Sequence, residues 1–217
     1  MKLIIGNKNY SSWSLRPWLF LRESGLEFEE INELLNKADT RERLARYSPS
    51  CKVPVLIDGE FTVWDSLAIC EYISDSRLDG RGWPADKHTR ALARAISAEM
   101  HAGFAAMRSE LPMNCRAMRK VTSSDAAARD VNRVIQIWND CISMSGGPWL
   151  FGEFSIADCM YAPVALRFRT YGIDPGKPAS TFVDAVLGNS HIQDWVRQAA
   201  EESEIIPEDE TGEPVTV

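Results

Sequence analysis

The pattern of apolar residues changes near residue 78, and this change constrains the fold more than any other feature of the chain. Before it, short apolar runs alternate with helix-like stretches, and after it almost every apolar pattern has helical spacing. The stretch LDGRGWPAD, residues 78–86, is rich in Gly, Pro and charge and separates the two regions. We therefore predict an α/β domain over residues 1–78, a linker over 79–86, an all-helical domain over 87–200 and an acidic tail over 201–217.

The N-terminal region is predicted to alternate strands and helices in the order βαβ, an irregular stretch, then ββα. An Asp-Gly turn joins the last two strands. The predicted elements are strands at residues 3–5, 26–34, 53–58 and 60–64 and helices at residues 15–24 and 65–76.

The second region carries long amphipathic helical patterns over its whole length. A Ser-x-x-Asp sequence from Ser155 to Asp158 resembles a capping box and indicates the start of one helix, and another is expected from Ser190. We find no internal repeat and no low-complexity segment.

The charge of the chain is concentrated at its C-terminal end. The formal net charge is −7, from 31 acidic and 24 basic residues. Residues 201–217 hold seven acidic and no basic residues, so the preceding 200 residues balance at 24 against 24. A neutral body argues against a nucleic-acid-binding groove, and the tail is expected to be a solvated, poorly ordered end.

The sequence shows no sign of a membrane segment, a leader peptide or a metal site. Its apolar runs are far shorter than a membrane span, which indicates a cytoplasmic protein. Five cysteines, an odd number without a Cys-x-x-Cys motif, favour reduced buried thiols. The three histidines form no ligand spacing with them, so no metal is expected.

The stretch SSWSLR places Ser11, Ser12 and Ser14 between the first strand and the first helix. A serine hydroxyl at a helix N-terminus can donate a hydrogen bond to a bound thiolate, and this donation lowers a thiol pKa from its ordinary value of about 8.5. Ser14 falls within the first helical turn and is expected to cap it.

Two further features point to a ligand with both charges of an amino acid. The Val53-Pro54 pair is either an edge-strand feature or a cis peptide, and a cis bond would turn the Val53 backbone outward toward a peptide ligand. Asp65 and Ser66 lie at a helix N-terminus, where exposed amides and a hydroxyl suit a carboxylate and Asp65 suits an ammonium group. The alternative is that Asp65 only caps the helix.

These motifs together resemble the glutathione transferase superfamily, in particular a bacterial member with a serine motif like that of the zeta class. SSWSLR resembles the zeta-class SSCSWR, KVPVLIDGEFTVWDSLAICEYI resembles the glutathione-binding core, and FSIADCMYAPV resembles the capping-box helix of the second domain. The resemblance implies a thioredoxin-like βαβ-α-ββα N-terminal domain with a cis-proline, an all-α helical-bundle C-terminal domain, and a homodimer.

The resemblance also implies roles for individual residues. Ser11, five residues before Arg16, would activate the thiol of glutathione, with Ser12 as the next candidate. Glutathione, as co-substrate, would contact five residues, with Lys37 and Arg41 as competitors of Lys52 for its glycyl carboxylate. The five residues are Lys52, Val53, Pro54, Asp65 and Ser66.

The acceptor side departs from the zeta pattern. Trp13 replaces a cysteine beside the presumed thiol, and Met100 and Phe104 are candidates for an apolar acceptor pocket, although such a stripe is more often core. Arg167 and Arg169 do not match the zeta substrate arginine, whose position is taken by Thr170. They are expected to face solvent, and a role in substrate binding is the less favoured alternative.

We therefore predict a glutathione transferase that uses a serine hydroxyl to activate glutathione for attack on a small, largely apolar electrophile. The alternatives are a glutathione-dependent isomerase or dehalogenase, and a non-catalytic binding module of the same fold.

Overall fold

The computed structural model describes residues 1–215, and its first part is built on a four-stranded sheet. The elements of this part are β1 (Lys2–Gly6), α1 (Ser12–Glu23), β2 (Glu29–Glu33), α2 (Thr40–Ala45), β3 (Val55–Asp58), β4 (Phe61–Trp64) and α3 (Ser66–Arg77). The strand order is β2-β1-β3-β4. β1 pairs with β2 in parallel and with β3 antiparallel, and β3 pairs antiparallel with β4.

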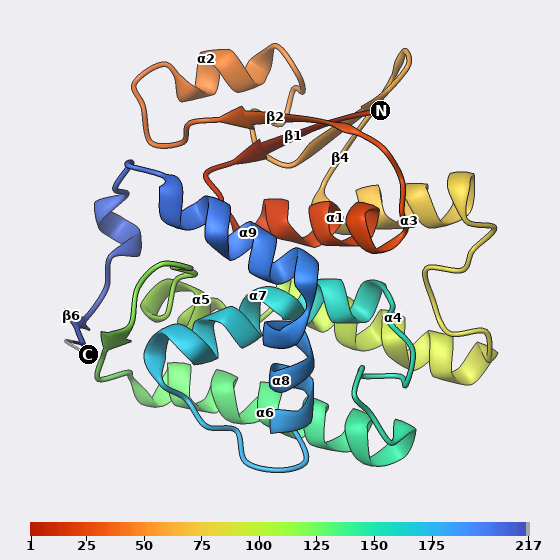
Figure 1. The fold of residues 1–217 in the computed structure, drawn as a ribbon, viewed down its shortest axis with the longest axis vertical. Coiled ribbons are helices and arrows are strands. Elements are labelled where there is room, and N and C mark those ends of the chain that lie inside the picture. The colour runs from red at the N-terminus through yellow and green to blue at the C-terminus, as the bar shows by residue number, and fades with distance from the viewer. Residues whose placement is uncertain (216–217) are drawn as a thin grey trace.

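The sheet is covered on both faces, by α2 on one and by α1 and α3 on the other (Figure 1). Successive side chains of a strand point to opposite faces. Ile4 and Val55 accordingly pack with Leu44 of α2, whereas Leu3 and Ile5 belong to the larger core formed with α1 and α3. Apolar runs buried on both sides explain why these strands lack a polar alternation.

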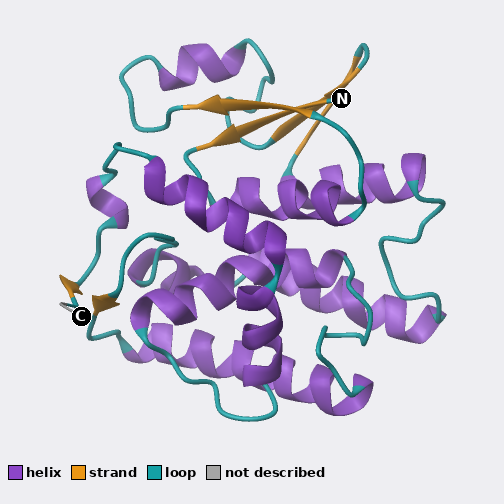
Figure 2. Cartoon of the chain, in the orientation of Figure 1, coloured by secondary structure: helices purple, strands orange, loops and turns teal. Residues whose placement is uncertain are grey.

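The second part is helical apart from one short ladder (Figure 2). Its elements are α4 (Lys87–Ala102), α5 (Ala105–Glu110), β5 (Arg119–Lys120), α6 (Asp125–Ser145), α7 (Ile156–Tyr171), α8 (Ser180–Gly188), α9 (Ser190–Glu201), a 3₁₀ turn (Pro207–Asp209) and β6 (Glu213–Pro214). α7 is buried along nearly its whole length. It packs against α1 and α4, so one continuous apolar core joins the two parts.

The predicted fold class, an α/β region followed by an all-helical one, is confirmed. The interpretation of Pro54 as an edge-strand residue is wrong, because β3 lies inside the sheet and begins only at Val55. The Val53-Pro54 peptide is cis, which was the other alternative.

The sequence predicted that the segment after α9 is a solvated, poorly ordered end, but in the structure this segment packs against the body of the protein. The Glu202 carboxylate accepts hydrogen bonds from the backbone N–H groups of Lys8 (2.6 Å) and Asn9 (3.0 Å). Arg116 donates to the carbonyl groups of Glu202 (2.6 Å) and Glu204 (2.8 Å). The acidic segment is therefore held against the loop that leads into α1.

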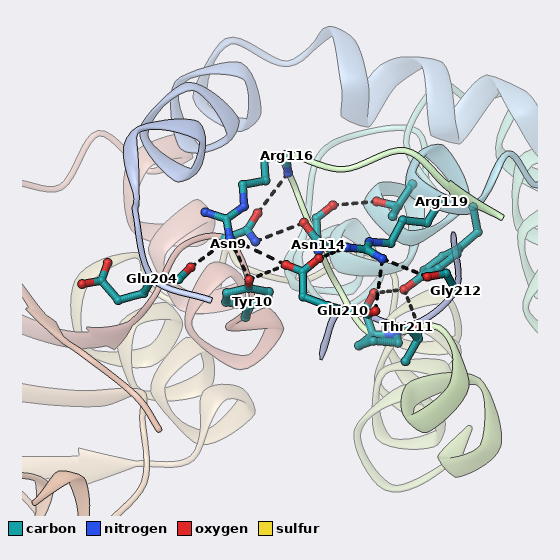
Figure 3. Close-up of polar contacts among 12 residues, drawn as sticks. Asn9, Tyr10, Asn114, Arg116, Arg119, Glu204, Glu210, Thr211 and Gly212 are labelled. Carbon is teal, nitrogen blue, oxygen red and sulfur yellow. Dashed lines mark hydrogen bonds and ion pairs between the residues drawn. The ribbon is translucent and has the colours of Figure 1, made fainter. Parts of the chain in front are cut away.

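A second group of contacts holds the segment further along (Figure 3). Tyr10 donates to Glu210 at 2.5 Å, and Arg119 donates to the Glu210 side chain and to the carbonyl of Gly212 (3.0 Å). Carboxylates of the tail are thus paired with arginine side chains and backbone N–H groups of the rest of the chain. A count of charges along the sequence could not show this pairing. Residues 216–217 of the predicted tail lie outside the described residues.

Asp158 stabilises the start of the central helix α7. Its carboxylate is fully buried and accepts hydrogen bonds from the backbone N–H groups of Leu150 (2.9 Å) and Ser155 (2.8 Å) and from the Ser155 hydroxyl (2.9 Å). Burial raises the pKa of Asp158 to about 7, and the donated bonds limit the rise. The Ser-x-x-Asp sequence therefore marks a helix start, as predicted.

We expect Asp158→Ala to lower the free energy of unfolding by about 2–4 kcal/mol, because it leaves two buried N–H groups without acceptors. Chemical denaturation of the parent and the variant measures the change. Asp125→Ala, which removes an exposed acid from the first turn of α6, is the matched control and should cost well under about 1 kcal/mol. Equal losses for both variants would show that the buried carboxylate has no special role.

Candidate functional site

The three serines of the SSWSLR stretch have three different environments. Ser11, not Ser14, is the N-cap of α1: its hydroxyl oxygen accepts from the N–H of Ser14 at 3.3 Å. Its proton is donated to the Ser14 hydroxyl at 2.7 Å. Ser14 accepts in turn from the N–H of Gly6 at 3.0 Å and ties the helix to the end of β1. The prediction that Ser14 caps the helix was therefore wrong, because the cap lies one turn earlier.

Ser12 is contacted from the other part of the chain. The Arg167 guanidinium, on α7, donates to the Ser12 hydroxyl oxygen at 3.2 Å and to the carbonyl of Leu111 at 2.7 Å. Within residues 1–215 no acceptor takes the proton of Ser12 itself. Ser12 is thus polarised by a cation while its own proton remains available. Arg167 is only 4% exposed, so the prediction that it faces solvent was wrong, whereas Arg169 is exposed.

A cavity of about 460 Å³, which we call the serine pocket, opens beside these hydroxyl groups. Its wall mixes apolar and charged residues from both parts of the chain. Its lining residues include Ser11, Ser12, Trp13, Leu35, Leu44, Lys52, Val53, Arg108, Met113, Arg167 and Asp209.

A second cavity of about 240 Å³, the acid pocket, adjoins the first. Trp13, Lys52 and Val53 line both cavities, so the two share a wall. The remaining lining residues of the acid pocket are Ser50, Pro54, Trp64, Asp65 and Ser66.

The acid pocket combines a carboxylate, a free hydroxyl and a helix N-terminus. Asp65 caps α3, accepting from the N–H groups of Leu67 (2.9 Å) and Ala68 (3.4 Å). The hydroxyl of Ser66 is buried and has no partner within the described chain. An unpartnered buried hydroxyl at a helix N-terminus is suited to receive the carboxylate of a ligand. Neither the N–H nor the C=O of Val53 has a hydrogen-bond partner in residues 1–215.

Only some of the predicted basic and apolar candidates line the two pockets. Lys52 lines both pockets, whereas Lys37 and Arg41 are exposed and line neither. Trp13 forms part of the shared wall. Met100 and Phe104 lie in the apolar core away from both pockets, because their face of the chain packs inward rather than toward the opening.

Two arginines pack on the ring of Trp13, and a third, Arg167, reaches the neighbouring Ser12. The Cζ atoms of Arg16 and Arg108 lie 4.4 and 4.7 Å from the centre of its ring. Together with Arg167, they form no ion pair among residues 1–215. The side chains of Arg16 and Arg167 are buried and that of Arg108 is partly buried. Within residues 1–215 the three side-chain nitrogens of Arg16 have no hydrogen-bond partner.

The electrostatic consequence is a local excess of positive charge. Burial, followed by repulsion from Arg108 and Arg167, lowers the pKa of Arg16 to about 9. Burial, followed by repulsion from Arg108, lowers the pKa of Arg167 to about 10. Burial lowers the pKa of Arg108. Asp209, from the C-terminal segment, also lines the serine pocket, and burial raises its pKa while Arg167 lowers it. Such a site favours anions.

Sequence reasoning missed three residues at or beside the pockets. Arg108 and Asp209 line the serine pocket, and Nε2 of His101 lies 3.1 Å from Oδ2 of Asp65. Arg108 follows a break at Gly103 and lies on a six-residue helix, and Asp209 lies in a segment predicted to be solvated. Their position depends on how the helical part folds back, for which the local sequence has no signal.

Two negative findings apply to the described residues. No helix in residues 1–215 is long and apolar enough to cross a membrane. Over the same residues, no group of three or more His, Cys, Asp or Glu side chains could hold a metal ion.

Comparison with known proteins gives matches over both parts of the chain. The family described as glutathione S-transferase, N-terminal domain, matches residues 10–76, and the family described as glutathione S-transferase, C-terminal domain, matches residues 90–198. A glutathione transferase homologue from Burkholderia, solved with bound glutathione, has a TM-score of 0.72 and 24% identity and covers 93% of this chain and 98% of its own.

Curated relatives include enzymes of different names. Dichloromethane dehalogenase of Methylorubrum extorquens is 38% identical over 65 residues, 29% of this chain and 22% of that protein. Maleylacetoacetate isomerase of Rattus norvegicus is 27% identical over 169 residues, 75% of this chain and 76% of that protein. The chain spans only 22% to 42% of the length of the first three curated relatives. Because the two domain families match in order and cover most of the chain, it belongs to the glutathione transferase family.

Proposed function

We propose that the chain is a serine-type glutathione transferase in which glutathione spans the two adjoining pockets. The observation that carries this proposal is the shared wall: a peptide that passes Val53 can reach both the acid pocket and the Ser12 hydroxyl. Its γ-glutamyl end would meet Asp65 and Ser66, its cysteinyl unit the free backbone groups of Val53 beside Pro54, and its glycyl carboxylate Lys52.

We further propose that Ser12, rather than Ser11, donates the hydrogen bond to the glutathione sulfur. The Ser11 proton is already donated to Ser14, whereas the Ser12 proton is free and its oxygen accepts from Arg167. A hydroxyl that accepts from a cation is a stronger donor. Both this bond and the nearby guanidinium charge favour the thiolate over the thiol.

The chemistry that follows is a transfer of the glutathionyl group. The thiol proton leaves to solvent and the thiolate sulfur forms a bond to an electrophilic carbon. In a substitution the leaving group departs from that carbon with the electron pair of the broken bond; in an addition the π-electron pair shifts onto the neighbouring atoms of the acceptor, which then takes a proton from solvent. Holding the sulfur and the acceptor together in one cavity supplies the remaining rate acceleration.

The acceptor that suits the serine pocket has an apolar body and an anionic group. Leu35, Leu44 and Met113 supply apolar walls, while Arg108 and Arg167 bring positive charge without a paired carboxylate. A carboxylate on the acceptor would satisfy these cations as a charge-assisted pair. We therefore propose an electrophile that is largely apolar and carries one anionic group.

A glutathione-dependent isomerase is the second candidate, supported by the name of the Rattus norvegicus relative and by the same cationic wall. It would use the same thiolate, adding to a double bond and leaving again after rotation. We also propose a cytoplasmic homodimer: the five cysteines are free, and Phe61 and Trp64 are exposed on the sheet-edge strand β4. No partner other than glutathione, the electrophile and a second copy is proposed.

Bound glutathione should have a thiol pKa at least about one unit below the free value, and Ser12→Ala should return it toward that value. The measurement is an ultraviolet titration of the thiolate in the parent, Ser12→Ala and Ser11→Ala. Ser11→Ala is the matched control; it should leave the pKa within about half a unit and lower stability by about 1 kcal/mol through the lost cap.

The reverse result, a pKa restored by Ser11→Ala alone, would make Ser11 the donor. Glutathione that binds without a shifted pKa, or does not bind, would favour the non-catalytic module.

Arg108→Gln should remove the preference for an anionic acceptor. Ethacrynic acid and its methyl ester are electrophiles that differ in one negative charge, and we expect the parent to have the higher kcat/KM with the acid. The variant should lose about tenfold or more in kcat/KM with the acid and much less with the ester, since a charge-assisted bond contributes about 1.5–3 kcal/mol. Arg129→Gln, at an exposed position on α6, is the control. Equal losses with both acceptors would contradict an anion-binding role.

A further inference from the structure

His101 connects the helical part of the chain to the acid pocket. It lies in the last turn of α4, and its Nε2 atom is 3.1 Å from Oδ2 of Asp65. Its ring packs edge-on against Trp13, with ring centres 5.2 Å apart. The helical domain thus touches the carboxylate that the N-terminal domain presents.

Asp65 is held in an uncommon conformation. Its φ of 78° and ψ of 145° lie in a region that residues other than glycine rarely adopt. Oδ1 accepts from the N–H groups of Leu67 and Ala68, and Oδ2 faces His101, so both oxygens are oriented. A carboxylate has about four acceptor positions, which leaves room for one more donor on this partly exposed side chain.

The protonation state of His101 determines how much of the negative charge of Asp65 is available to a ligand. Nδ1 is buried without a partner within residues 1–215. This suits a neutral ring with its proton on Nε2, because Nδ1 is then an unpaired acceptor rather than an unpaired N–H donor that carries positive charge. Burial lowers the pKa of His101; Asp65 raises it, and Arg16 and Arg108 lower it further. A neutral imidazole faces Oδ2 of the carboxylate at 3.1 Å and leaves its negative charge uncancelled.

We propose that His101 is a positioning residue for glutathione, which holds the Asp65 carboxylate toward the γ-glutamyl ammonium group without neutralising it. This inference rests on the proposed function, since it concerns the same glutathione site. It makes affinity for the ammonium group depend on a residue of the helical domain. A lysine at this position would pair with Asp65 and compete with the ligand.

The test is calorimetric binding at pH 7.5 of glutathione and of glutaryl-cysteinyl-glycine, which lacks only the α-amino group. We expect His101→Ala to weaken glutathione binding about tenfold and to leave binding of the analogue nearly unchanged. His101→Gln, whose amide N–H can reach the same oxygen, should recover most of the affinity. His101→Lys should weaken glutathione at least as much as His101→Ala does. His88→Ala, at an exposed position on the same helix, is the matched control and should change neither affinity.

Three results would overturn the inference: unchanged glutathione affinity in His101→Ala, equal losses for both ligands, or a parent that does not distinguish the two. The second would show a merely structural role, and His101→Gln measures this even if the Ala variant folds poorly. A parent that binds neither ligand would overturn the proposed function itself, and the inference with it.

Discussion

The packing of α1 against α7 is the constraint on which the rest of the site depends. Both helices bury their facing residues in one core, so the two parts of the chain have a fixed relative position. This position brings Arg167 from α7 to Ser12 in the first turn of α1. Helix α4 packs against the same helix α7, and this packing places His101 beside Asp65. Neither polar contact could form within one part alone. The contact of Arg167 with Ser12 is buried, whereas that of His101 with Asp65 is partly exposed.

The arrangement has an energetic cost that a ligand could offset. Burying an unpaired charge costs several kcal/mol, and the guanidinium groups of Arg16, Arg108 and Arg167 repel one another. Contacts with the ring contribute about 0.5–2 kcal/mol each and compensate only in part. A thiolate and an anionic acceptor would supply the missing negative charge. A site that favours anions in this way also favours the transition state if charge moves from sulfur onto the acceptor.

The sequence predicts the parts of this site that are local. The fold class, the helix start at Ser155 and the alternative of a cis bond before Pro54 follow from propensity, capping and turn rules, and the structure has all three. The sequence predicts the wrong serine as the cap of α1, because Ser11 and Ser14 both suit the first turn. The residues from distant elements, Arg108 and His101 among them, depend on the tertiary packing of helices. Apolar residues at helical spacing have the same pattern on a core face and on a pocket wall. Met100 was therefore predicted to line a pocket, whereas it lies in the core.

The C-terminal segment shows the same limit for charge. Its acidic residues predict a solvated end when only their number is considered. In the structure they meet Arg116, Arg119 and the amides after β1, and the segment reaches the serine pocket at Asp209. Net charge bears on solubility and on the choice of binding partners. Whether a charged segment is ordered depends instead on the pairing of its charges in the folded structure.

The most direct measurement is a crystal structure of the protein with glutathione bound. Our account predicts the sulfur atom about 3 Å from Oγ of Ser12, with Arg167 still donating to that oxygen and the γ-glutamyl ammonium on Asp65. A sulfur atom that contacts Ser11 instead, or a glutathione molecule that lies outside the two pockets, would contradict it.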